Sequence, residues 1–145
     1  MNEAEQRAAV IAEARTWLKT PFHHMARIKG AGVDCAQILI AIYYACDLIP
    51  DIQTGYYPQD WHLHSDDERY LEWVKEYAYQ VDSALPGDLV MFKFGRCHSH
   101  GAVVIEWPMI IHAYKGEGCI ISDAMKDPLA GRKVKIFRLN QWGEK

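Results

Sequence analysis

The sequence predicts an α+β fold, in which helices from the N-terminal half pack on an antiparallel sheet formed by the C-terminal half. Segments with helical apolar periodicity lie before Pro86-Gly87, and short segments rich in β-branched and aromatic residues lie after it. Hydrophobic residues make up 50% of the 145 residues and charged residues 24%, the balance of an ordinary globular protein. Because no repeat, linker or low-complexity segment divides the chain, residues 1–145 are expected to form a single domain.

The first half of the chain predicts two helices separated by a loop. Residues 3–19 place their apolar side chains on one stripe among charged positions, and Thr20-Pro21 ends this helix. Residues 22–34 show no period and contain glycines, which predicts a loop. Residues 35–47 are apolar for too long to be a single strand, so a buried central helix is expected there, with Cys35 in its first turn.

A second loop, a third helix and the strands follow. Residues 50–64 combine turn formers with aromatic side chains that are bulky enough to line a groove. Ser65 and Glu68 have capping-box spacing, and the apolar side of the helix that they begin extends to Val81. Five strands are expected after this helix, over residues 88–94, 101–107, 109–114, 118–122 and 133–139.

Net charge and hydropathy disfavour two classes of partner. Sixteen Lys and Arg residues against nineteen Asp and Glu give a net charge of −3, so no nucleic-acid binding is expected. No apolar run approaches the ~18 residues of a membrane span. The N-terminal segment carries Glu3, Glu5 and Glu13 where a secretory signal would be basic and then apolar, which predicts synthesis in the cytoplasm without a signal peptide.

Cys35 is the strongest candidate for a reactive group. The chain has four cysteines, widely spaced and without a secretory context, which are expected to be reduced thiols. Unpaired N–H groups and the positive end of the helix dipole stabilise a thiolate at a helix N-terminus, where Cys35 is expected. Cys46 at the far end of the same helix and Cys119 within a strand are expected to be ordinary buried thiols.

A cysteine nucleophile needs a base and a third group that orients the base. His100 begins one expected strand and His112 lies in the next, with the turn near Trp107-Pro108. In an antiparallel hairpin these two imidazoles are opposite or diagonal neighbours on one face. If the helix packs its N-terminal end on that face, a Cys, His, His row results. A protonated His100 beside Cys35 would then lower the thiol pKa below 7.

The same residues also fit structural and metal-binding roles. His100 and His112 each fit an ordinary structural role, and Cys97-His98-Ser99-His100 is half of a zinc site. No second ligand pair at zinc spacing occurs elsewhere, so neither a metal nor another cofactor is expected. Asp34 fits a helix N-cap and is also a candidate partner of a substrate amine or guanidinium. The other histidines are expected to line a groove or face solvent: His23, His24, His62, His64 and His98.

Six segments resemble the NlpC/P60 cysteine peptidases of the cell wall, in particular their short phage and prophage members. In family order they are TPFHH (20–24), GVDCAQIL (32–39), YYPQDWHLHSDDERYLE (56–72), PGDLVMFKF (86–94), SHGAVVIEW (99–107) and IIHAY (110–114). The resemblance implies a papain-like α+β core with Cys35 as nucleophile, His100 as base and His112 as the group that orients it. The implied reaction is hydrolysis of an amide in peptidoglycan stem peptides, commonly next to D-glutamate and diaminopimelate.

The chain departs from this family at two places near Cys35. Many members have a tyrosine where Phe22 stands and a Ser-Gly pair in place of Ala36-Gln37. Those hydroxyls position the substrate or the oxyanion, so here the backbone N–H of Cys35 is expected to carry more of the oxyanion site. Four residues are the candidate substrate-binding groups, namely Asp34, His23, His24 and Tyr56.

The resemblance also implies where the protein acts. A wall substrate lies outside the cytosol, and without a signal peptide the expected routes are delivery in a virion tail or release at lysis. Phage tail proteins are therefore candidate partners beside the stem peptide. Two other readings stay open: a papain-like amidase or acyltransferase acting on another bond, and a catalytically silent phage structural protein.

Overall fold

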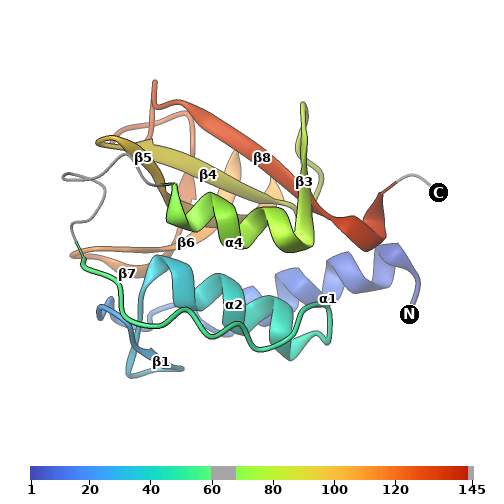
Figure 1. The fold of residues 1–145 in the computed structure, drawn as a ribbon, viewed down its shortest axis with the longest axis horizontal. Coiled ribbons are helices and arrows are strands. Elements are labelled where there is room, and N and C mark those ends of the chain that lie inside the picture. The colour runs from blue at the N-terminus through green and yellow to red at the C-terminus, as the bar shows by residue number, and fades with distance from the viewer. Residues whose placement is uncertain (60–67, 144–145) are drawn as a thin grey trace.

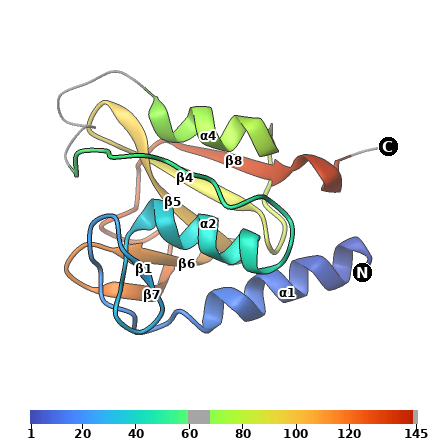
Figure 2. The same ribbon diagram turned by 60° about the horizontal axis from the view of Figure 1, so that its bottom comes forward.

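A computed structural model describes residues 1–59 and 68–143. In this part of the chain, the helices α1 (Glu3–Arg15), α2 (Cys35–Ala45) and α4 (Arg69–Tyr77) pack on one side of an antiparallel sheet (Figures 1 and 2). The sheet has the strand order β3-β8-β4-β5-β6-β7. Its strands are β3 (Ala78–Val81), β4 (Leu89–Phe94), β5 (Cys97–Glu106), β6 (Met109–Tyr114), β7 (Gly118–Asp123) and β8 (Val134–Leu139). The predicted α+β class and its antiparallel sheet are confirmed.

The segment predicted as a loop between the first two helices contains a small hairpin. Strands β1 (Arg27–Ile28) and β2 (Gly32–Val33) pair there. At the other end of the chain, a short 3-10 helix (Asn140–Trp142) follows β8. Helix α1 is shorter than predicted, since it ends at Arg15 and a turn leads to Lys19, whose φ is 74°. Helix α2 begins at the predicted residue.

The prediction of a third helix running to Val81 is wrong. Helix α4 ends at Tyr77, and Ala78–Val81 forms the edge strand β3, which pairs with β8 from Ala78↔Leu139 to Val81↔Ile136. The free edge of β8 offers backbone groups that an extended segment satisfies, and this non-local pairing outweighs the helical pattern of the sequence. Ser65 of the expected capping box lies outside the described residues.

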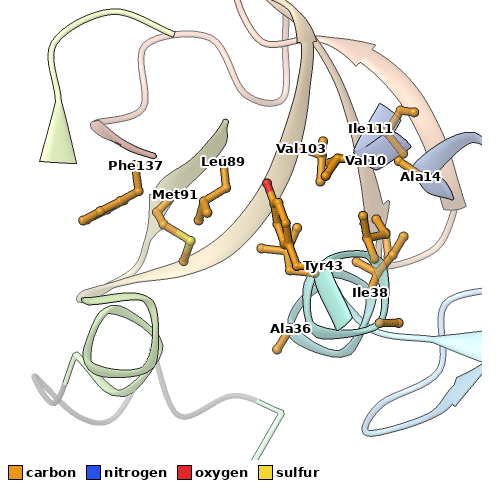
Figure 3. Packing of buried hydrophobic residues seen from close by; sticks show 14 of the residues in the cluster. Val10, Ala14, Ala36, Ile38, Tyr43, Leu89, Met91, Val103, Ile111 and Phe137 are labelled. Carbon is orange, nitrogen blue, oxygen red and sulfur yellow. The ribbon is translucent and has the colours of Figure 1, made fainter. Parts of the chain in front are cut away.

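Apolar side chains form a separate cluster on each face of the sheet. The larger cluster lies between the sheet and the helices, and Figure 3 shows Val10 of α1 and Ile38 and Tyr43 of α2 facing the sheet residues Val103 and Ile111. Because α2 is covered by the sheet and by α1, most of its side chains are buried, which explains its nearly continuous apolar sequence. The smaller cluster covers the opposite face, with Phe92, Val104 and Ile110 among its members.

A buried carboxylate ties α1 to the sheet. Asp88, which is 1% exposed, contacts Arg7 of α1 at 3.0 Å and Arg138 of β8 at 2.9 Å. The backbone N–H of Leu85 also donates to Asp88. These charge-assisted bonds satisfy the buried carboxylate and give the Pro-Gly-Asp segment a structural role.

No helix among the described residues is long and apolar enough to cross a bilayer.

Candidate active site

Asp34 fixes the point at which α2 begins. Its Oδ1 accepts hydrogen bonds from the backbone N–H groups of Ala36 (3.1 Å) and Gln37 (2.8 Å), so Cys35 is the first helical residue. Its Oδ2 accepts from the N–H of Met25 (2.7 Å) and the hydroxyl of Tyr57 (2.6 Å). The expected N-cap role is confirmed, and four donors from the protein itself surround this carboxylate, which is 2% exposed.

The sulfur of Cys35 lies against the backbone on both sides of His100. Sγ contacts the carbonyl oxygen of Ser99 at 3.4 Å, and the backbone N–H of Gly101 donates to the sulfur. The hydroxyl of Tyr70 on α4 donates to the carbonyl oxygen of Cys35 at 2.7 Å. Contacts from β5 and from α4 therefore hold the start of α2 in place.

Gly101 allows this close approach. A Cβ atom at this position would lie 2.7 Å from Cδ1 of Leu39 on α2 and 2.8 Å from the hydroxyl of Tyr70. Real Cβ contacts are essentially never this short, so any side chain at Gly101 would require the side chains of Leu39 and Tyr70 to shift.

The two predicted histidines are hydrogen-bonded to each other. His100 Nε2 and His112 Nδ1 are 2.7 Å apart, and the pairing Val103↔Ile111 makes the two residues diagonal neighbours on β5 and β6. This confirms the proximity expected from the hairpin. Both rings are almost fully buried, with exposed fractions of 7% for His100 and 2% for His112.

The two histidines lie on a different face of the sheet from the one expected, which is the face that α2 covers. Ile111 and Ala113, which flank His112, point into the helix-facing cluster, so His112 points to the other face. The ring of His100 packs beside Phe92 and Phe94, which belong to or pack on the smaller cluster. The expected row with all three side chains on one face of the sheet does not form, because Cys35 packs on the helix-facing cluster.

Cys35 and His100 line one cleft of about 700 Å³, within the usual size range of ligand pockets. The described lining residues are Phe22, His24, Asp34, Cys35, Ala36, Tyr57, Pro58, Gln59, Tyr70, Trp73, Phe94, Ser99, His100, Tyr114 and Lys115. Of the four expected substrate-binding residues, His24 and Asp34 are in this lining.

The cleft contains Tyr57 where the sequence suggested Tyr56. Tyr56 is 76% exposed, whereas Tyr57 is buried, donates to Asp34 and packs edge-on against His24. The side chain of His23 is exposed and lies outside the lining. Adjacent residues in an extended segment point in opposite directions, so the sequence pattern could not choose between the two tyrosines.

Among the described histidines, His98 forms a separate contact with Glu68 at 3.3 Å. His62 and His64 lie outside the described residues. Within residues 1–59 and 68–143, no group of three or more His, Cys, Asp or Glu side chains could hold a metal ion.

The protonation of the cluster differs from the expected ion pair. Burial, reinforced by the charge of Asp34, raises the pKa of the Cys35 thiol to about 12, although backbone N–H groups oppose the shift. Burial, followed by the neighbouring His112, lowers the pKa of His100 well below its ordinary value, and burial lowers that of His112 to about 4. The expectation of a thiol pKa below 7 is therefore wrong for the ligand-free protein, because desolvation outweighs the helix dipole. In the resting protein the thiol and both imidazoles are therefore neutral at neutral pH.

This neutral resting state predicts the pH dependence of Cys35 alkylation. A raised thiol pKa means that the thiolate fraction keeps growing as the pH rises. We expect the rate of alkylation by iodoacetamide to increase continuously from about pH 6 to about pH 9, without a plateau below pH 7. The measurement is the rate constant for modification of Cys35, followed by peptide mass spectrometry in a Cys46→Ala background, because Cys46 is also partly exposed. A plateau with a midpoint below pH 7 would instead reveal a standing ion pair.

A partly buried cysteine at a capped helix start and a hydrogen-bonded histidine pair on an antiparallel sheet characterise this site. Solved NlpC/P60 domains have the same fold. The NlpC/P60 domain of peptidoglycan hydrolase SagA aligns over 90% of this chain and 97% of its own, with TM-score 0.62 and 19% identity. NlpC1 from Trichomonas vaginalis aligns over 95% of this chain, with TM-score 0.63 and 16% identity. An NLP/P60 family protein similar to lipoprotein from Staphylococcus aureus aligns over 93%, with TM-score 0.59 and 16% identity.

The chain spans 45% of the Trichomonas protein and 42% of the staphylococcal one. No family model and no curated protein matches the sequence. At these identities the likeness establishes the fold, and the chemistry has to be argued from the site.

Proposed function

We propose that this protein is a cysteine endopeptidase that hydrolyses amide bonds in the stem peptides of peptidoglycan. The observation that carries the proposal is the arrangement in one cleft: Cys35 at the capped start of α2 lies beside His100, whose Nε2 is hydrogen-bonded to His112. A nucleophile, a base and an orienting group are the parts that thiol hydrolysis requires. The shared fold with an NlpC/P60 domain of a peptidoglycan hydrolase supports the choice of substrate.

We assign the two nitrogens of His100 different tasks. Nε2 is engaged with His112, so Nδ1 exchanges protons with the thiol. As Sγ attacks the scissile carbonyl carbon, the thiol proton passes to Nδ1, and the carbonyl oxygen becomes an oxyanion beside the backbone N–H of Cys35. The intermediate collapses, the C–N bond breaks, and the leaving amine takes the proton from His100. This leaves an acyl-enzyme.

Water completes the cycle at the same groups. His100 Nδ1 accepts a proton from water as the water oxygen attacks the thioester carbon. The C–S bond then breaks, the carboxyl product leaves, and the proton returns to the sulfur of Cys35. Both histidines are buried and neutral in the resting state. This suits the exchange, because the base can accept the thiol proton only if it does not already carry an extra proton.

Lys115 supports a linkage that involves D-glutamate. It is exposed in the turn after β6, lines the cleft, and forms no ion pair with another described residue. A D-glutamate joined through its side chain to a diamino acid keeps a free α-carboxylate close to the scissile amide. We propose that Lys115 attracts this carboxylate and that the bond between D-glutamate and diaminopimelate is cut.

Replacing Lys115 by methionine is expected to raise the KM for stem peptides with free D-glutamate about 2- to 5-fold, the contribution of an exposed ion pair. The KM for the corresponding D-isoglutamine peptide, which lacks the carboxylate charge, should not change. Steady-state kinetics on both peptides check this, and Lys126→Met is a matched control because Lys126 is exposed outside the cleft. An equal change of KM for both peptides would contradict a carboxylate contact.

Mass spectrometry of the soluble fragments released from purified peptidoglycan tests the proposed function. Fragments cut within the stem peptide, produced by the unaltered protein and not by Cys35→Ala, are the expected result. Glycan pieces that carry intact stems would show a glycosidase, and an unchanged wall preparation would contradict hydrolysis.

We also propose that the protein is of phage or prophage origin and reaches the wall in a virion tail or at lysis. The resemblance of its sequence segments to short phage and prophage members supports this. Immunodetection in purified particles and in lysates of induced cells tests it, and absence from both would contradict it.

A further inference from the structure

The row of hydrogen-bonded side chains continues beyond the two histidines. His112 Nε2 lies 2.7 Å from the hydroxyl oxygen of Ser122. The pairs Ile110↔Ser122 and His112↔Ile120 make Ser122 a diagonal neighbour of His112 on β7, as His100 is on β5. Three adjacent strands thus contribute one side chain each to a line that begins beside Cys35.

The ring nitrogens that carry the protons of His100 and His112 decide whether His100 can act as a base. Each imidazole is neutral at neutral pH, so each carries one proton, and the hydrogen bond between the rings holds only one. If His112 carries its proton on Nε2, its Nδ1 accepts from His100 Nε2–H, and His100 Nδ1 is free to take the thiol proton. In the reverse arrangement His112 donates from Nδ1, and the proton of His100 occupies Nδ1, where it blocks that transfer.

The surroundings of Ser122 favour the productive arrangement. His112 is 2% exposed, and among the described residues its Nε2 has Ser122 as its hydrogen-bond partner. Ser122 is itself partly exposed on the edge strand β7, so its own hydroxyl proton can be donated to water. The oxygen then accepts from His112 Nε2–H.

We propose that Ser122 is a positioning residue, which holds His112 in the Nε2–H form and thereby leaves Nδ1 of His100 free for proton transfer from Cys35. This inference rests on the proposed function for its catalytic consequence, although the proton arrangement exists without substrate. Ser122 acts through two successive hydrogen bonds and does not line the cleft.

Threonine and valine at position 122 form a matched pair. Their side chains have nearly the same shape and both suit a strand, but only threonine has a hydroxyl. Nitrogen-15 NMR of the imidazole rings reads the protonated nitrogen directly. We expect His112 to be Nε2–H in the unaltered protein and in Ser122→Thr, and to gain a measurable Nδ1–H population in Ser122→Val. Nδ1–H in the unaltered protein, or no change in folded Ser122→Val, would overturn the proposal.

Kinetics supply the second measurement. We expect Ser122→Val to lower kcat about 10-fold at unchanged KM, in the range seen by analogy when outer hydrogen-bond partners of metal ligands are removed, and Ser122→Thr to stay within about 2-fold. Equal kcat in the two variants would overturn the positioning role. Because the NMR measurement needs no substrate, an unaltered protein that is inactive on stem peptides but shows the Nε2–H form would contradict the proposed function and support this proton arrangement.

Discussion

Replacing Cys35 by alanine is expected to lower kcat for stem-peptide hydrolysis by at least about 10³-fold without unfolding the protein. Under the proposed function the sulfur forms the acyl-enzyme, and alanine has no group that can do so. The structural cost is small, because Asp34 rather than Cys35 caps α2 and alanine is the best helix former. Steady-state rates on one stem peptide, together with circular dichroism, check both parts of this expectation.

Cys46→Ala is the matched control. Cys46 lies at the other end of α2, outside the cleft lining, so its replacement should leave kcat unchanged. Activity of Cys35→Ala above a few per cent of the parent would refute the assignment of the nucleophile. Loss of activity in a folded Cys46→Ala would show that removal of any thiol from α2 is harmful, and the first result would then lose its meaning.

The second large effect separates His100 from His112. His100→Gln is expected to be as damaging as the loss of Cys35, because an amide cannot take up and return a proton. His112→Gln should keep substantial activity, since the carbonyl oxygen of glutamine can accept the hydrogen bond from His100 Nε2. His112→Ala removes that acceptor, and a loss of about 10- to 100-fold is expected by analogy with outer partners of metal ligands.

Steady-state kcat values for the three variants decide the assignment, with circular dichroism to verify folding. Similar activity of His100→Gln and His112→Gln would mean that His100 is not the base. A folded but inactive His112→Gln would mean that His112 itself exchanges protons with the substrate.

Features that depend on neighbours in sequence were predictable. The start of α2 follows from Asp34, whose side chain accepts from the N–H groups of Ala36 and Gln37. The contact of His100 with His112 follows from the symmetry of one hairpin. Ser122 belongs to a second hairpin and sits at the matching diagonal. The same symmetry argument could have located it, but a single serine in a strand gives no chemical signal by itself.

Features that depend on the rest of the fold were not predictable. Strand β3 exists because the edge of β8 is available, which the helical pattern before Val81 does not reveal. The same holds for ionisation: the dipole of α2 can be inferred from sequence, but the desolvation that raises the pKa of Cys35 depends on packing against β5 and α4. Local rules therefore predicted which side chains lie close together and misjudged their charge.

The absence of a side chain at Gly101 has a consequence for reading mutational scans. Its hydrogen atom faces the ends of the Leu39 and Tyr70 side chains where a methyl group does not fit, so even alanine would displace side chains that pack the start of α2 against β5. A library selected for wall hydrolysis would rank this glycine with Cys35 and His100, although it has no group that can react. Intolerance to substitution at this glycine reflects a lack of space between packed elements. Whether a residue takes part in the chemistry has to be established by other means.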